Sequence, residues 1–305
     1  MATPSPDRGA LVDHVTLRDA VGKFAAQPGP RGALDVLREC MYGELLLDIT
    51  GSDAVTGDAF APGSRLQIRT GTGPDGRSAL LAFTRNTEIG RLHPPGTPTQ
   101  SLATPAVGAL ELARRQEHAW LYPDPAGPRC ALSAAEIDFA LRNPNHAALK
   151  EALARHGAGD TDRATVAALL RPDSPLLVAV FDSSRIRTLT HPDGHTSILA
   201  FTSAPEVLAF SPADAVTALT TEQVLDTARR GGHSGIVINP AGPSIQLSLN
   251  QIAAWSGALS PGRRRRRSAL CPRSTGPTRC ARLRSTPPAR RPARGRPSSP
   301  PPWRS

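Results

Sequence analysis

The order of apolar and polar positions along the chain predicts short strands and amphipathic helices. Residues 176–181 form the continuous apolar run LLVAVF, which is typical of a strand covered on both faces. Residues 185–190 and 196–202 are rich in Ile, Thr and Leu, and they flank the tetrapeptide His-Pro-Asp-Gly. Proline fixes φ and glycine accepts a positive φ, so this pattern predicts a β-hairpin.

The pattern that follows predicts a helix and a second pair of strands. In Thr220–Arg230 a threonine can cap the first turn, two arginines occupy the last turn, and Gly231–Gly232 ends the helix. The apolar segments 235–239 and 244–249 lie on either side of a Pro-Ala-Gly-Pro turn, and a short helix closes the unit. With the helix-like stretch 164–170 at its start, the unit has the order α-β-β-β-α-β-β-α. This order predicts an α+β fold with a mostly antiparallel sheet and packed helices.

The chain contains this pattern twice. Residues 68–84 and 186–202 are identical at 11 of 17 positions at a constant offset of 118, and residues 113–133 and 228–248 are identical at 10 of 21 positions at an offset of 115. Chance would give one or two matches in each block. Both blocks keep their order, so we predict two tandem domains.

The domain boundaries follow from the duplication and from changes in composition. We predict a disordered start with a short helix over 1–32, a first domain over 33–143, a helical linker over 144–162, a second domain over 163–258 and a disordered basic tail over 259–305.

Two elements that carry polar side chains are kept in both copies. Each copy has an Arg-Arg pair followed by a histidine at a helix end, and a tight Asx-Pro-Ala-Gly-Pro turn between strands. Helix C-terminal capping explains the first element, and turn geometry explains the second. The alternative is a polar cluster, or a rigid loop, that contacts a ligand or a partner. The candidate interaction residues are Arg114, Arg115, His118, Arg229, Arg230, His233, Asn239, Pro240 and Gly242.

The motifs that resemble catalytic or cofactor sites lack the context that their chemistry needs. Residues 71–76 match GxGxxG, but a strand follows them where a dinucleotide site needs a helix. Residues 231–235 resemble a nucleophile elbow, but they follow a helix and the first copy has no serine there. His191 and His195 are too few for a metal site. We therefore expect no cofactor and no metal, and the pattern favours a non-enzymatic role.

The formal net charge of +10 comes from one segment. Residues 260–305 contain 14 Arg and 10 Pro and no acidic residue, whereas the rest of the chain has 22 basic and 26 acidic residues, a net charge of −4. We interpret this segment first as the product of a frameshift or a misassigned end, second as a native disordered extension, and third as a nucleic-acid-binding tail. No apolar run is long enough to span a membrane, and the N-terminal segment lacks the apolar region of a signal peptide, so we expect a cytoplasmic protein.

The chain resembles a known family. The LLV strand, the Pro-Asp-Gly hairpin, the LAFT strand and above all IVINPAGPSIQLSL (residues 236–249) are similar to the SseB protein N-terminal domain, in its actinobacterial form. The resemblance covers two tandem copies, over about 33–143 and 160–258. It implies an SseB-like fold and no established biochemical role. We expect a protein-interaction module with an unidentified protein partner. The alternatives are a small-ligand binder or enzyme that uses the Arg-Arg-His helix ends, and nucleic-acid binding through the basic tail, which we rank lowest.

Overall fold

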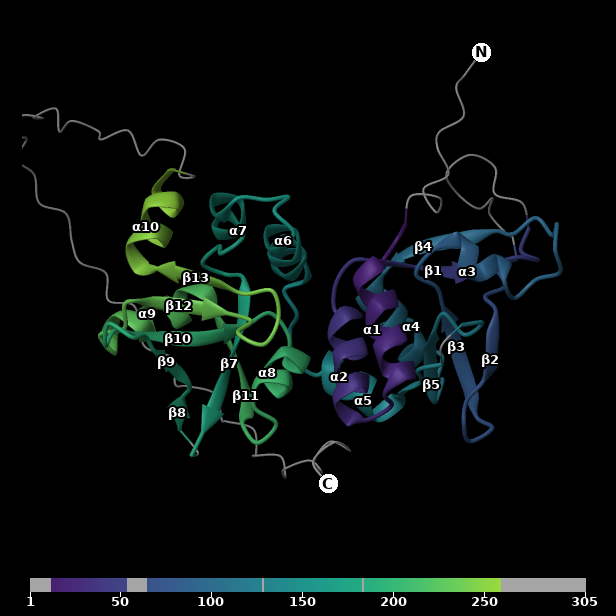
Figure 1. Cartoon of the computed structure of the whole chain (residues 1–305), viewed down its shortest axis with the longest axis horizontal. Coiled ribbons are helices and arrows are strands. Elements are labelled where there is room, and N and C mark those ends of the chain that lie inside the picture. The colour runs from purple at the N-terminus through teal and green to yellow at the C-terminus, as the bar shows by residue number, and fades with distance from the viewer. Residues whose placement is uncertain (1–11, 54–64, 128, 183, 259–305) are drawn as a thin grey trace, which may run out of the picture.

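The computed structural model describes residues 12–53, 65–127, 129–182 and 184–258, and it shows two α+β units side by side (Figure 1). The fold class is as predicted. The first unit contains α1 (Val15–Ala26), α2 (Pro30–Glu39), β1 (Glu44–Asp48), β2 (Thr70–Thr72), β3 (Ser78–Ala82), α3 (Asn86–Gly90), β4 (Ser101–Pro105), α4 (Ala106–Arg115), β5 (Trp120–Pro123), β6 (Leu132–Ser133) and α5 (Ala134–Leu141).

The second unit repeats this order with one additional short strand. It contains α6 (Ala147–Gly157), α7 (Arg163–Ala168), β7 (Pro175–Phe181), β8 (Arg185–Ile186), β9 (Thr188–Thr190), β10 (Thr196–Phe201), α8 (Ala204–Phe210), β11 (Ala215–Thr220), α9 (Thr221–Arg230), β12 (Gly235–Ile238), β13 (Ile245–Ser248) and α10 (Leu249–Ala258). The basic segment 259–305, predicted to be disordered, lies outside the described residues.

Corresponding strands build corresponding sheets. In the second unit the strand order is β11-β7-β10-β12-β13, with β8 paired to β7 and β9 to β10. In the first unit the equivalent strands form the pair β1-β4 and the sheet β2-β3-β5-β6, which meet at a bridge between Leu46 and Phe83. Within the described residues the pairs β3–β5 and β10–β12 are parallel and the other pairs are antiparallel, so the pairing in both units is mostly antiparallel as predicted.

The predicted element order omits one helix and one strand in each unit. The structure adds α3 and β4 in the first unit, and α8 and β11 in the second, between the hairpin and the Arg-Arg helix. These elements are only five to seven residues long. Such short segments complete too few turns or alternations for hydrophobic periodicity to identify them.

The predicted turns and helix ends have the backbone geometry that their residues favour. Gly76 and Gly194 in the two Pro-Asp-Gly hairpins both have a φ of +83°. Glu117, with a φ of +57°, and Gly232, with a φ of +69°, end α4 and α9 in the left-handed region. The next backbone N–H, that of His118 or its counterpart in the second copy, donates to a carbonyl five residues earlier and closes the helix.

Each unit begins with a helix that a histidine caps. Nδ1 of His14 accepts a hydrogen bond from the backbone N–H of Leu17, and Nε2 donates to the carbonyl of Tyr42 at 3.0 Å. His146 does the same for α6, with Nδ1 accepting from the N–H of Leu149. Nδ1 must be unprotonated in both caps, and burial lowers the pKa of both imidazoles below the ordinary value.

These caps predict a loss of stability in mild acid. A lowered histidine pKa means that the unfolded chain binds more protons, so the contribution is full above about pH 6.5 and is lost as the pH falls through the native pKa. We expect the melting temperature to fall from pH 7 to pH 5 by less in His14→Asn/His146→Asn than in the wild type, because asparagine still caps a helix but does not titrate. The exposed His195→Asn variant serves as the control. If it reduces the pH dependence of the melting temperature as much as the double variant does, the two caps are not the cause of that dependence.

The two units meet through different surfaces. Helix α8 of the second unit packs against α2 and α5 of the first (Figure 1). The apolar cluster at this junction contains Leu34 and Phe139 from the first unit with Phe201, Val207 and Leu208 from the second. Because α2 and α5 belong to one copy and α8 to the other, the arrangement is head to tail and not a symmetric pair.

Several of the residues that make this contact occur in one copy only. When the buried positions of α7 and α2 are aligned, Ala164 and Ala168 take the places of Leu34 and Arg38. At the offset of 115, Ala254 takes the place of Phe139. Helix α8 is apolar and almost entirely buried, whereas its counterpart α3 has the polar sequence Asn-Thr-Glu-Ile-Gly.

Candidate functional site

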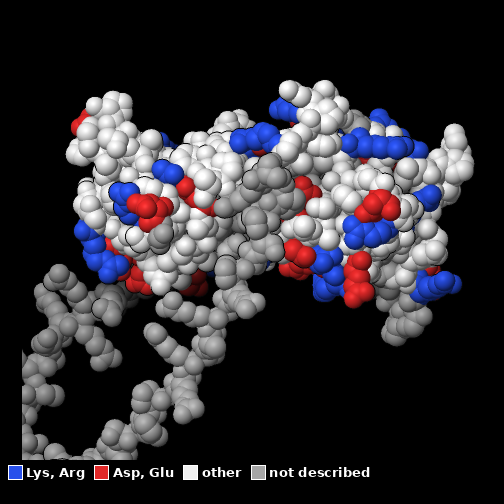
Figure 2. Space-filling model, turned by 90° about the horizontal axis from the view of Figure 1, so that it is seen from below, with Lys and Arg blue, Asp and Glu red and all other residues white. Residues whose placement is uncertain are grey.

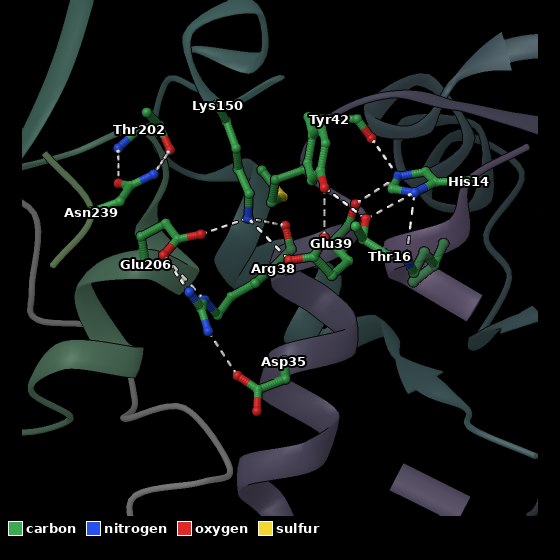
Figure 3. Close-up of polar contacts among 12 residues, drawn as sticks. His14, Thr16, Asp35, Arg38, Glu39, Tyr42, Lys150, Thr202, Glu206 and Asn239 are labelled. Carbon is green, nitrogen blue, oxygen red and sulfur yellow. Dashed lines mark hydrogen bonds and ion pairs between the residues drawn. The ribbon is translucent and has the colours of Figure 1, made fainter. Parts of the chain in front are cut away.

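A cluster of buried charges lies between the two units, and three different elements supply it (Figure 3). Arg38 comes from α2, Lys150 from α6 and Glu206 from the first turn of α8. One carboxylate oxygen of Glu206 accepts from Nζ of Lys150 at 2.5 Å, and the other accepts from Nη2 of Arg38 at 2.8 Å and from Nε at 3.1 Å. Glu206 is fully buried, and Lys150 and Arg38 are 3% and 7% exposed.

The charges of this cluster compensate one another. Burial alone would raise the pKa of the Glu206 carboxyl, but the neighbouring Lys150 and Arg38 lower it below its ordinary value. In the same way burial would lower the pKa of Arg38, but the charge of Glu206 raises it. Both groups therefore stay ionised at neutral pH. Arg38 also pairs with Asp35 at 2.8 Å, and Lys150 donates to the carbonyl oxygen of Arg38 at 2.6 Å.

The cluster continues into the first unit as a hydrogen-bonded chain. The Tyr42 hydroxyl donates to Glu39 at 2.7 Å and lies 2.7 Å from the Thr16 hydroxyl, and Lys150 lies over the Tyr42 ring at 5.1 Å from its centroid. Burial and the charge of Glu39 raise the pKa of the Tyr42 hydroxyl. Nε2 of His14 bonds the carbonyls of Tyr42 and Glu39, so the helix cap and the interface share a network (Figure 3).

The predicted turn residues lie directly beside this cluster. Asn239 is buried with a φ of +50°, and its amide bonds the backbone N–H and the hydroxyl of Thr202 (Figure 3). In the first copy Asp124, with a φ of +47°, makes the equivalent two bonds to Thr84. These side chains hold the turn onto the sheet. Pro240 is half-buried in the same turn.

Gly242 is the turn residue that approaches the other copy. A Cβ atom on Gly242 would overlap Nη2 of Arg38 and would lie 3.4 Å from Glu206. At the equivalent Gly127 of the first copy, a Cβ atom would meet only the carbonyl oxygen of Asp124, at 3.6 Å. The turn of the second copy thus needs a glycine so that the arginine of the first copy can reach Glu206.

This difference gives a matched pair of variants. We expect Gly242→Ala to displace the Arg38 guanidinium from Glu206 and to lower the free energy of unfolding by about 1–3 kcal/mol, the cost of disturbing a buried charged hydrogen bond. Gly127→Ala should change it by less than about 0.5 kcal/mol. Urea unfolding of the two variants measures both values. Equal losses in the two variants would show that alanine destabilises the turn itself and that contact with the arginine is not the cause.

The Arg-Arg-His helix ends lie in separate units and are engaged locally. Arg114 bonds Asp138 at 2.6 Å and the carbonyl of His118 at 3.0 Å, while Nδ1 of His233 lies 2.7 Å from the Thr196 hydroxyl. Arg115 and Arg229 pair with acids on their own helices at 3.9 Å and 2.6 Å. Arg230 is exposed and forms no ion pair with the described residues. The structure does not bring the two sets together: α4 and α9 lie in different units (Figure 1).

The polar groups of the buried cluster are engaged with one another. Lys150 and Arg38 have their donors occupied by carboxylate and carbonyl oxygens, and Glu206 accepts from both.

Within the described part of the chain, no group of three His, Cys, Asp or Glu side chains could hold a metal ion. The helices described there are too short or too polar to cross a membrane. Figure 2 shows acidic and basic side chains interspersed on the face that it presents.

Sequence reasoning missed the residues of this cluster, although a signal for them exists. Residues 13–21, DHVTLRDAV, align with 145–153, NHAALKEAL, at an offset of 132. The alignment pairs the two capping histidines, and it also pairs Arg18 with Lys150. At the offset of 118, Glu88 corresponds to Glu206. Glu88 is buried too, but its partners Arg85 and Arg91 come from the same copy.

Comparison with known proteins identifies the repeats. The model of the SseB protein N-terminal domain matches residues 17–138 and again residues 149–254. The chain belongs to the SseB family. The two matches confirm the predicted resemblance and the tandem duplication. No curated protein matches the chain. Among solved structures, "Anabaena Tic22 (protein transport)" aligns at 10% identity over 66% of this chain and 87% of that chain, with a TM-score of 0.16, which is too low to indicate a shared fold.

The two SseB matches begin at equivalent positions, Leu17 in α1 and Leu149 in α6. Both helices pack on the next helix of their own unit and carry the same histidine cap. The domain boundaries at 33–143 and 163–258 stay a prediction. We propose to begin each SseB unit at its capped helix, so that α6 opens the second unit.

Proposed function

We propose that this SseB-family chain is a non-enzymatic protein-interaction module. The observation that carries the proposal is that one SseB unit already binds a surface of the other unit within the same chain. Helix α8 and the turn around Gly242 hold α2 of the first unit through an apolar contact, a buried arginine–glutamate pair and a hydrogen bond from Arg31 to the carbonyl of Ala209 at 2.7 Å. The fold thus supports recognition of helices by means of its turns and helix ends.

The alternative of a ligand site or an active site at the Arg-Arg-His ends has less support. The side chains of Arg114 and His233 already bond groups of their own unit, and the two ends belong to different units. Nucleic-acid binding through residues 259–305 concerns a segment outside the described residues. Residues 1–258 carry a net charge of −4, so the rest of the chain does not favour a polyanion. A cytoplasmic location belongs to the same proposal.

The test combines capture with the matched glycine variants. The tagged full chain, expressed from its own locus, is isolated and weighed by native mass spectrometry. We expect the wild type and Gly127→Ala to bind a protein partner in stoichiometric amount. Gly242→Ala should bind it more weakly, because loosening the interface between the two units disturbs their arrangement. A small-molecule mass that disappears in Arg229→Ala, or a turnover lost in His233→Ala, would replace the proposal with the ligand or enzyme alternative.

A further inference from the structure

A cavity at the junction of the two units forms a groove. It has a volume of about 760 Å³. The segment 12–16 and Tyr42–Glu44 of the first unit form one wall, and the outer face of α6 forms the other. We call this cavity the junction groove. It lies beside the buried charge cluster, because Tyr42 and Thr16 line the groove and also belong to the cluster.

The walls of the junction groove contain apolar and small side chains. Val15, one of the four large apolar side chains exposed among the described residues, is 48% exposed and lies in the groove. Opposite it, α6 presents Ala147, Ala154 and Ala158 at positions that follow one face of the helix. Small side chains leave room for a partner backbone, and an amphipathic helix laid in a groove is a common mode of peptide recognition.

The rim of the junction groove is acidic. Glu44, Glu151 and Asp160 are exposed there, and none of them forms an ion pair with the described residues. Asp13 also lies on the rim, but it pairs with Arg18 at 2.6 Å. Among the residues that line the groove, Arg155 is the one arginine and there is no lysine. The unpaired charges around the apolar walls are therefore mainly negative.

From these features we infer that the junction groove binds an amphipathic helix of a partner protein that carries lysine or arginine beside its apolar face. The apolar face would cover Val15 and the alanines of α6, and the basic side chains would meet the three unpaired carboxylates. The inference rests on the proposed function and gives it a surface and a partner chemistry. A groove of this size takes one face of a helix about 10 Å wide and not a whole domain.

The test uses the full chain and a synthetic probe. The probe is an 18-residue amphipathic peptide of leucine and lysine, and its control has glutamate in place of every lysine. Titrations followed by backbone amide shifts in two-dimensional NMR should place the basic peptide at residues 12–16 and along α6. The triple variant Glu44→Lys/Glu151→Lys/Asp160→Lys should weaken binding by about 10-fold or more, because each exposed pair contributes up to about 1 kcal/mol.

The matched control reverses three exposed acids away from the groove, in Glu117→Lys/Asp173→Lys/Glu222→Lys. An equal loss in this control would mean attraction to net charge and would overturn the inference. Shifts elsewhere, or equal binding of the glutamate peptide, would overturn it as well. The peptide-free full chain is also compared with a chain that lacks residues 259–305. If the amide shifts of the groove residues differ between the two, the occupant is the chain's own basic segment and not a partner. If the wild type and the triple variant at the groove capture a native partner equally well, that result would support the proposed function but would reject the junction groove as the binding surface.

Discussion

Glu206→Ala is expected to lower the free energy of unfolding by about 3–5 kcal/mol, because it leaves Arg38 and Lys150 buried without their shared counterion. The exposures of 7% and 3% show that both cations are largely shielded from water at the junction between the units. Chemical unfolding at pH 7, followed by circular dichroism, measures the loss. A decrease below about 1 kcal/mol would contradict the view that this cluster fastens the units together.

Two further variants separate the charge effect from the loss of packing. In the first copy Glu88 is equally buried, but the side chains of its partners Arg85 and Arg91 are 37% and 55% exposed and can turn to solvent. Glu88→Ala should therefore cost only about 1 kcal/mol. Replacement of all three members of the buried cluster by methionine should recover most of the loss, because apolar side chains of similar volume need no counterion.

Phe139→Ala is expected to cost about 3–4 kcal/mol and to separate the unfolding of the two units. Phe139 lies on α5 of the first unit, is 8% exposed and belongs to the apolar cluster at the junction with α8. Its loss leaves a cavity between the units and not inside either core. Differential scanning calorimetry should show one transition in the wild type and two in the variant.

A core variant of the first unit provides the comparison. Phe83→Ala removes a fully buried phenylalanine that packs with Leu46, Leu81 and Ile89 of its own unit. We expect a loss of similar size, about 3–5 kcal/mol, but with the contact to the second unit intact. If Phe83→Ala splits the transition as clearly as Phe139→Ala does, the position of the phenylalanine at the junction is not what couples the units.

The sequence was sufficient to predict the repeats, the α+β class and the turns, because each of these depends on local patterns. Pro-Asp-Gly needs glycine at a φ of +83°, and the helix ends before His118 and His233 need a left-handed residue, whichever unit they belong to. The parallel pairs β3–β5 and β10–β12 join segments far apart in the chain, and no local pattern specified them.

The site could not be predicted in the same way, because its residues are meaningful only in combination. Arg38, Lys150 and Glu206 stand on three helices, 56 or more positions apart, and each resembles an ordinary surface charge on its own helix. Gly242 was selected as a turn residue, but its closeness to Arg38 depends on how the units pack. The interaction role of the Arg-Arg-His residues stays a prediction.

The unequal surfaces of the two copies also determine how far the assembly can grow. A contact between different faces of like units has no natural end, and it produces rings or open filaments when every unit carries both faces. Here the arginine and phenylalanine that dock occur on the first copy only, and the apolar α8 that receives them occurs on the second only. Duplication followed by divergence has thus produced an assembly that stops at two units, because neither unit keeps the surface that would bind a third. Because one chain supplies both units, their pairing does not depend on protein concentration.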